Sequence, residues 1–261
     1  MNSILCHIVL AWSIFSSEVL LAQISAQGQG GKDVIWLAAG VEQQIGKRWT
    51  NKNAVAYSRH SGLNDWNATE QGGIFTVREE LSYRLSKHFK ISQGVFYAER
   101  SYYDSEHPEY INEVRFYPKV YHEFEIKKVK FSQYLRTDIR LFSGPGSQSY
   151  NKPLEIRNRY LMKVTLPLDH DDKNYLVGMT ELFFATDEKR EKDGSTHFTA
   201  YQFTENRTSF YFRHHIEKPN AFFDAGIMVQ TWKDAALGRF RETYILQIDL
   251  ILINPFARKN N

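Results

Sequence analysis

The sequence lacks several features that define common classes of protein. Cysteine occurs once, as Cys6, in a chain of 261 residues, so disulfides, thiol catalysis and cysteine metal sites are not expected. Beyond the N-terminal stretch, no apolar run reaches the roughly 18 residues that a membrane helix needs. The mean hydropathy is also negative, at -0.49. These absences exclude a helical membrane protein.

Basic clusters, helical periodicity and phosphate-binding loops are missing as well. The formal net charge is +3 at pH 7 and is dispersed along the chain, which argues against nucleic acid as a partner. Apolar residues at helical spacing do not persist for three turns, so the sequence predicts an all-β protein. The run Gly144, Pro145 and Gly146 is typical of a turn. No cofactor is expected.

The chain does contain many short runs in which charged and apolar residues alternate. Arg136, Asp138 and Arg140, for example, are interleaved with Leu135 and Ile139. Because residues two apart in a strand lie on the same face, each run predicts a strand with one ionic and one apolar face. A soluble sandwich would bury the apolar face, whereas a membrane barrel turns it to lipid and keeps the charges in its lumen.

Eleven segments have the character of strands. They are residues 35–45, 49–59, 74–85, 89–100, 111–124, 129–142, 154–166, 175–185, 203–216, 222–232 and 243–253. Short turns and long polar loops alternate between them, as in outer-membrane barrels. The sequence therefore predicts an all-β, antiparallel up-and-down transmembrane β-barrel. If both chain ends are periplasmic the strand number is even, so we expect twelve strands, with one missed near residues 27–33, and ten as the alternative.

The N-terminus has the pattern of an export signal. Residues 4–21 are mostly apolar and are followed by a Gln/Gly/Ser-rich stretch over residues 23–31. This pattern predicts a secretory signal peptide over residues 1–26, cleaved after Ala22 or Ala26, and a single β-barrel domain over residues 27–261. A buried N-terminal helix is the alternative. Export would place the barrel in a bacterial outer membrane, with membrane lipid as its surroundings.

Several short motifs resemble those of a known family. They are Lys47-Arg48-Trp49, Glu113-Val114-Arg115, Tyr134-Leu135-Arg136, Arg157-Asn158-Arg159-Tyr160 and Glu205-Asn206-Arg207. In these motifs the chain is similar to an uncharacterised family of bacterial outer-membrane proteins, domain of unknown function 2490, frequent in Bacteroidetes. The resemblance implies an outer-membrane β-barrel and brings no established activity or catalytic residues. Such barrels commonly end on an aromatic residue, whereas here a polar tail follows Phe256.

The charged residues on the predicted inner faces are the candidate functional set. They are Arg78, Glu80, Arg84, Glu113, Arg115, Arg136, Asp138, Arg140, Arg157, Arg159, Glu205 and Arg207. One interpretation is that cross-strand ion pairs fill a narrow lumen and fix its shape. The other is a polar conduit in which the excess of arginine selects small anionic solutes. Eight arginines and four carboxylates make up the set, which favours anions.

We therefore predict an outer-membrane barrel that acts as a small charge-lined pore, or whose lumen is plugged and whose outer loops bind a ligand. An enzyme is not expected. A barrel hydrolase of lipids or surface polymers would pair Ser132 or Ser209 with His215, but no base-orienting partner can be recognised. Adjacent His214 and His215 point to opposite faces, so no metal site is predicted. A secreted soluble β-protein that binds a ligand inside is the remaining alternative.

Overall fold

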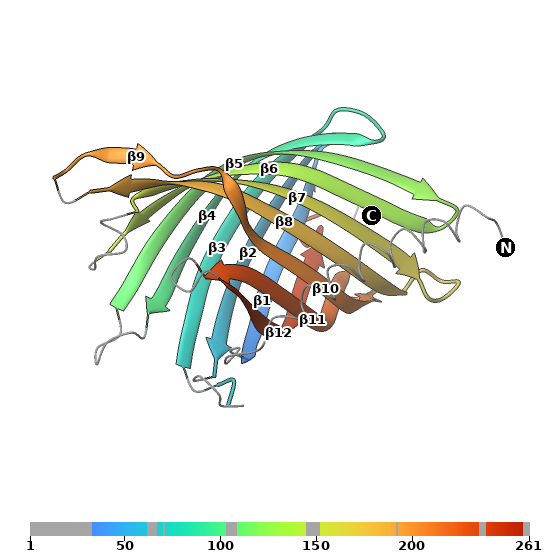
Figure 1. Cartoon of the computed structure of the whole chain (residues 1–261). Coiled ribbons are helices and arrows are strands. Elements are labelled where there is room, and N and C mark those ends of the chain that lie inside the picture. The colour runs from blue at the N-terminus through green and yellow to red at the C-terminus, as the bar shows by residue number, and fades with distance from the viewer. Residues whose placement is uncertain are drawn as a thin grey trace, which may run out of the picture.

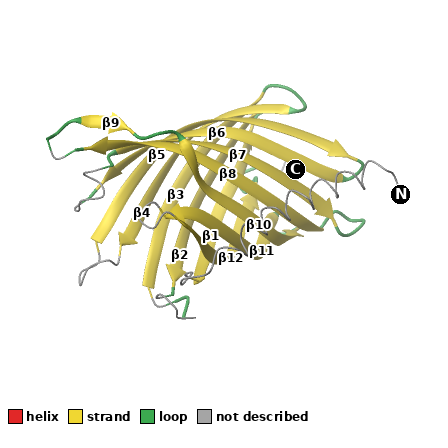
Figure 2. Cartoon of the chain, viewed as in Figure 1, coloured by secondary structure: helices red, strands yellow, loops and turns green. Residues whose placement is uncertain are grey.

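The computed structural model describes residues 33–61, 67–69, 71–102, 109–144, 152–191, 193–234 and 239–257. These residues form β-strands and their connections, and none of the described ranges contains a helix that could cross a membrane (Figure 2). The predicted signal peptide, and residues 27–32 of the segment where an additional strand was expected, lie outside the described residues.

Most ends of the predicted segments are extended by one or more residues in the structure. The described residues form twelve strands. They are β1 Asp33–Ile45, β2 Trp49–His60, β3 Gln71–Arg84, β4 Phe89–Tyr102, β5 Glu109–Ile126, β6 Val129–Ser143, β7 Leu154–Pro167, β8 Asn174–Arg190, β9 Thr196–Phe198, β10 Gln202–Ile216, β11 Ala221–Asp234 and β12 Arg239–Ile253.

The strands close into a barrel (Figure 1). From β1 to β8 each strand pairs with the next in antiparallel orientation, and β10, β11 and β12 continue the series after β10 pairs with β8. The three-residue strand β9 pairs with β8 alone and stands outside the ring. Parallel pairing of β1 with β12 completes the closure. The prediction of an all-β barrel of about twelve strands is confirmed.

The parallel pairing of β1 with β12 explains how the ring can hold an odd number of strands. The ring itself holds eleven strands, and β9 is the twelfth. A strictly antiparallel ring needs an even number, because neighbouring strands alternate in direction. With eleven strands the first and last run the same way, and the register from Asp33↔Tyr244 to Glu42↔Ile253 shows this pairing over ten residues of β1.

The two ends of the barrel differ in their connections. At the short-turn end, tight connections join β1 to β2, β3 to β4, β5 to β6, β7 to β8 and β10 to β11. Three of these connections contain a residue other than glycine in the left-handed region: Lys127 (φ 50), Asp172 (φ 53) and Asn220 (φ 64). The opposite, long-loop end carries the remaining connections. Strands extend into it further than predicted, so that residues 235–238 alone separate β11 from β12.

Apolar side chains cover the outer face of the sheet and charged side chains the inner face, the opposite of the arrangement in a soluble protein. Outward-facing Leu135 and Ile227 are 63% and 59% exposed, while inward-facing Glu113 and Asp138 are 0% exposed. Alternation along each strand produces this result, because every second side chain points to the lumen. Glu79 faces outward between Val77 and Leu81 on β3 and is an exception to this sorting.

Candidate functional site in the barrel lumen

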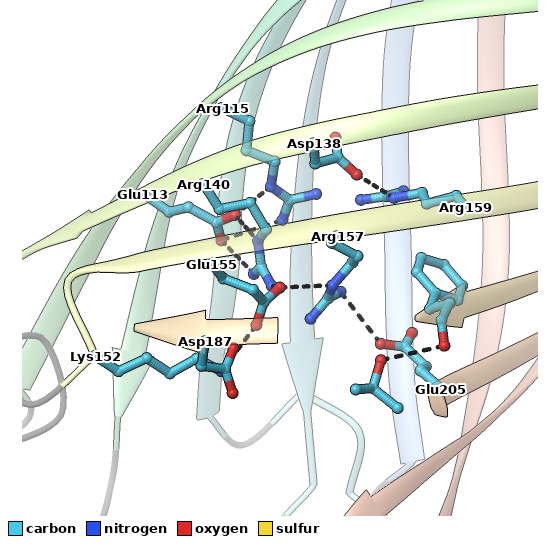
Figure 3. A network of polar contacts seen from close by, with 12 residues as sticks. Glu113, Arg115, Asp138, Arg140, Lys152, Glu155, Arg157, Arg159, Asp187 and Glu205 are labelled. Atoms are coloured by element: carbon cyan, nitrogen blue, oxygen red, sulfur yellow. Dashed lines mark hydrogen bonds and ion pairs between the residues drawn. The ribbon is translucent and has the colours of Figure 1, made fainter. Parts of the chain in front are cut away.

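Glu113 on β5 is the centre of an ion-pair network on the inner wall (Figure 3). Its carboxylate accepts hydrogen bonds from Arg100 Nη2 at 3.0 Å, Arg115 Nη2 at 3.1 Å and Arg140 Nη2 at 2.9 Å. The three guanidinium groups come from β4, β5 and β6. Three donors around one fully buried carboxylate satisfy its negative charge and join the three strands.

The network continues from β6 to β10 through alternating charges (Figure 3). Arg140 also pairs with Glu155 on β7. Glu155 lies 2.6 Å from Arg157 Nε, and Arg157 Nη1 lies 3.5 Å from Glu205 on β10. Glu205 in turn pairs with Arg207. Each carboxylate therefore lies between two guanidinium groups, and the wall is held together without an isolated negative charge.

A second cluster lies on β6, β7 and β8. Asp138 accepts a hydrogen bond from Arg136 Nε at 2.8 Å, and its other carboxylate oxygen lies 2.5 Å from Arg159 Nε. Arg159 also approaches Glu181 on β8, with 3.7 Å between Nη1 and Oε1. The Tyr134 hydroxyl donates to the same Glu181 oxygen at 2.5 Å.

The third cluster surrounds Glu80 on β3. Its carboxylate lies 2.7 Å from Lys119 Nζ and accepts hydrogen bonds from the hydroxyls of Tyr121 at 2.6 Å and Tyr117 at 3.2 Å. The guanidinium of Arg136 lies 3.4 Å from the centre of the Tyr117 ring, which links this cluster to the second one by a cation–π contact.

Local sequence explains why these pairs form. Glu113 and Arg115 are two positions apart on one strand, and so are Arg136 and Asp138. Side chains at this spacing share a face and can reach each other, and both pairs form ion pairs within their strand. Cross-strand register adds a further contact, because Arg140 lies directly opposite Glu155. The alternation in the sequence is thus the origin of the network.

The structure brings ten of the twelve charged residues of the candidate functional set into these clusters. They are Glu80, Glu113, Arg115, Arg136, Asp138, Arg140, Arg157, Arg159, Glu205 and Arg207. Arg78 lines the cavity but makes no ion pair within 4.0 Å in the described part of the chain. Arg84 lies at the short-turn end of β3, exposed and apart from the network.

Sequence reasoning missed several members of the clusters. Glu155 and Lys119 stand in the same alternation as their predicted neighbours and were open to recognition from that signal. Arg100 closes the network from the end of β4, and Glu181 reaches it from β8. Their segments carry fewer charges, so the alternation there is weaker and gave little indication of their role.

A cavity of about 1220 Å³ lies beside the ionic clusters. Its basic lining residues are Lys52, Arg78, Lys90, Arg100, Arg115, Lys119, Arg136, Arg140, Lys152, Arg157, Arg159, Lys163, Arg207 and Arg213. Its acidic lining residues are Glu42, Glu80, Glu123, Glu155, Glu181 and Asp249. Glu113, Asp138 and Glu205, which hold the clusters together, do not line it. The cations therefore face the open space, and several of their carboxylate partners lie behind them.

The opposite wall of the cavity has a group of small side chains on β1 and β2. Ala38, Gly40, Ala54 and Ala56 line the cavity there. A Cβ added to Gly40 would lie 2.9 Å from the carbonyl oxygen of Asn53, so a larger residue cannot enter without a shift of the backbone. Short side chains on these two strands leave free the volume that long charged side chains occupy elsewhere.

Of the two serines considered for a hydrolase, Ser209 is not brought to His215. The two residues lie six positions apart on β10, a separation of about 20 Å at the usual strand rise. His215 Nε2 contacts Asn220 Oδ1 at 2.9 Å, and the buried Ser209 hydroxyl has no hydrogen-bond partner within the described ranges. Those ranges also contain no group of three or more His, Cys, Asp or Glu side chains placed to hold a metal ion.

A closed ring of strands with an ionic interior and an apolar exterior defines a β-barrel protein with a charged lumen. Comparison with known proteins then identifies the family. The family model described as "Protein of unknown function (DUF2490)" matches residues 33–241, and the chain belongs to this family. No curated protein and no solved structure matches the chain.

Proposed function

We propose that the protein is an outer-membrane β-barrel whose lumen admits small anionic solutes. The observation that carries the proposal is the reversed sorting of its two faces, in which acidic and basic side chains are buried and large apolar side chains are exposed. Hydrocarbon is the surrounding in which such an exterior is stable. The cationic surface of the cavity supplies the preference for anions.

The exposed apolar belt extends over most of the ring. Among its members are Leu37, Val55, Phe75, Val77, Leu81, Val95, Phe116, Leu135, Ile139, Phe210, Ile227 and Leu246. Apolar area in water is unfavourable by about 25 cal/mol per Å², and soluble monomers rarely expose contiguous apolar patches beyond a few hundred Å². This belt favours the membrane barrel over the secreted soluble protein.

Aromatic rings at the short-turn end support the same placement. Trp49 and Tyr83 lie side by side with 4.7 Å between ring centres, and Phe124 and Phe131 are stacked at 5.0 Å. All four stand at the ends of their strands. Aromatic side chains gather at headgroup depth in membrane barrels, so this ring of aromatics fits one membrane surface.

The cavity favours a passage over a fully plugged lumen. The clustered ion pairs lie along β3–β8 and β10, and a cavity of about 1220 Å³ remains beside them. Cations outnumber carboxylates on its surface, and positively charged side chains along a pore select anions. The ion pairs then have a structural role, because they fix the long arginine side chains along the wall.

Membrane residence is tested by fractionation of cells that export the full chain. We expect the protein in the outer-membrane fraction, released by detergent and retained after a high-salt wash. On a gel, the folded barrel should migrate differently before and after boiling. Recovery of folded protein in aqueous buffer without detergent would contradict the proposal.

Anion passage is tested with purified protein in planar bilayers under a potassium chloride gradient. The reversal potential should report a preference for chloride. Arg136→Ala and Arg157→Ala should lower that preference, because each removes a lumenal cation. Arg84→Ala, which removes an exposed arginine outside the clusters, is the matched control. Folded protein without conductance would contradict the passage and favour the plugged lumen.

A further inference from the structure

A second cavity of about 370 Å³ lies toward the short-turn end of the lumen. It is lined by residues of the β3–β4 turn and by the adjacent ends of β5, β6, β7, β8, β10 and β11. Five residues line both cavities: Glu123, Ser132, Lys163, Arg213 and Phe222. We call this set the neck, because it borders both the main cavity and the second one.

Two of the three charged residues of the neck are neutralised by partners. Glu123 lies 2.7 Å from Lys90 Nζ. Arg213 donates two hydrogen bonds to Asp224, at 2.7 Å and 2.6 Å, and its guanidinium lies 4.9 Å from the centre of the Phe222 ring. Both charges are therefore fixed in position and balanced.

Lys163 on β7 is the third charge, and it has no such partner. The charged groups that act on it most strongly are Arg213, Asp224, Lys52 and Glu123. Each of these four is already engaged, since Lys52 pairs with Glu42 at 2.7 Å and the others form the pairs given above. Within the described ranges Lys163 makes no ion pair, and its Nζ lies 5.7 Å from the centre of the Tyr211 ring.

Lys163 is half-buried and lines both cavities, so its side chain is open to a solute in the lumen. On the neighbouring strand, directly opposite Lys163, the register places Ser132, another member of the neck. Its hydroxyl is not engaged in a hydrogen bond in the described part of the chain and is a donor available to an oxyanion.

We propose that Lys163 and Ser132 form the anion site that sets the selectivity of the lumen, at the neck between its two cavities. The ligand class is small oxyanions, phosphate or carboxylate groups, which accept from an ammonium and a hydroxyl together. This inference rests on the proposed function, which supplies the passage that the site would govern. The ion-pair clusters shape the wall, and Lys163 is the charged residue of the neck that has no ion pair within the described ranges.

The first test is reversal potential in planar bilayers for Lys163→Glu, with Lys128→Glu in the β5–β6 turn as the matched control. Lys163→Glu should lower the anion-to-cation permeability ratio by about tenfold or more, because a carboxylate replaces an amine between the two cavities. Lys128→Glu should leave the ratio near that of the unmodified protein. Equal ratios for both variants, or an unchanged ratio in Lys163→Glu, would overturn the role of Lys163.

The second test needs no conductance and separates this inference from the proposed function. Inorganic phosphate is titrated calorimetrically into the detergent-folded barrel. The unmodified protein and Lys128→Glu should bind it alike, and Lys163→Gln should bind about tenfold more weakly. Because glutamine is uncharged and of similar size, this variant avoids the added charge of Lys163→Glu. Equal phosphate binding by Lys163→Gln would refute the site even if the barrel conducts anions.

Discussion

The lumen has two walls that differ in the size and charge of their side chains. On β5, β6 and β7, long charged side chains such as Glu113, Arg140 and Glu155 fill the interior and hold one another in place. On β1 and β2, small residues such as Ala38 and Ala54 face the same lumen with almost no side chain. The first wall is called the ionic wall below, and the second the small-residue wall.

The difference separates two properties that a barrel needs. The ionic wall joins neighbouring strands through side chains, in addition to the backbone ladder, and so contributes to stability. The small-residue wall adds few contacts but leaves the free volume of about 1220 Å³. Loss of a carboxylate that holds the ionic wall together should therefore mainly lower stability, and changes in the small-residue wall should mainly alter what passes through the lumen.

Removal of the central carboxylate should have the largest effect. Glu113→Ala leaves Arg115 and Arg140 buried with one fewer partner, and breaking a buried pair typically costs about 3–5 kcal/mol. The free energy of unfolding, measured by urea titration in detergent, should fall by that amount. Arg84→Ala should change it by less than about 0.5 kcal/mol, as surface changes do. Equal losses for the two variants would show that the ionic wall does not stabilise the barrel.

Filling the small-residue wall should affect passage more than stability. In Ala54→Phe a ring enters the open part of the cavity, so single-channel conductance should fall by roughly half or more. Val55→Phe changes the adjacent residue, which faces outward, and should conduct like the unmodified protein. A similar fall in both variants would mean that the cavity beside β2 is not the conducting path.

A carboxylate placed on the small-residue wall should sharpen the contrast between the walls. In Ala38→Glu the new charge faces a lumen surface rich in cations, so anion preference should decrease by a few-fold. Stability should change by less than about 1 kcal/mol, as is usual for a charge in contact with water. Reversal potentials and urea titration measure the two effects. A large loss of stability without a change in selectivity would contradict the division of roles.

The smallest effect is expected at the short-turn end, outside both walls. Asp169 accepts backbone hydrogen bonds from Lys173 and Asn174, which hold the pKa of its carboxyl below the ordinary value. Because the pKa of this carboxyl is depressed in the folded protein, the carboxylate contributes to stability at pH values above its ordinary pKa. That contribution to stability is lost as pH falls through the pKa of the folded protein.

Thermal denaturation of the unmodified protein and of Asp169→Asn tests this turn. The unmodified protein should be slightly more stable at about pH 6, and the difference should shrink below about pH 4, where an unperturbed aspartate becomes protonated. A difference that grows toward acid pH would show that the carboxylate does not hold the turn.

Much of the fold could be predicted because alternation is a local property. The alternation around Arg136, Asp138 and Arg140 predicts both the strand and the face of it that points inward. A spacing of two along the strand brings such residues into contact. Closure could not be predicted in the same way. The parallel pairing of β1 with β12 joins residues some two hundred positions apart, and no local pattern encodes it.

The site shows the same limit. Its charged members were recognisable along each strand, but the cavity depends on which strands face each other across the lumen. The small side chains of the small-residue wall carry no charge and gave no signal of a site. Lys163 stands in a segment with the same alternation as its neighbours, and only the absence of a partner in three dimensions distinguishes it.

The most direct test of the central claim is a cysteine scan along β2, in a chain whose Cys6 is replaced by serine. Single cysteines at positions 53 to 57 are labelled with an environment-sensitive fluorophore, and the barrel is folded into lipid vesicles. Labels at 53, 55 and 57 should be quenched by lipid-attached quenchers, and labels at 54 and 56 by aqueous iodide. Quenching by iodide alone at all five positions would contradict the claim that hydrocarbon covers the outer face.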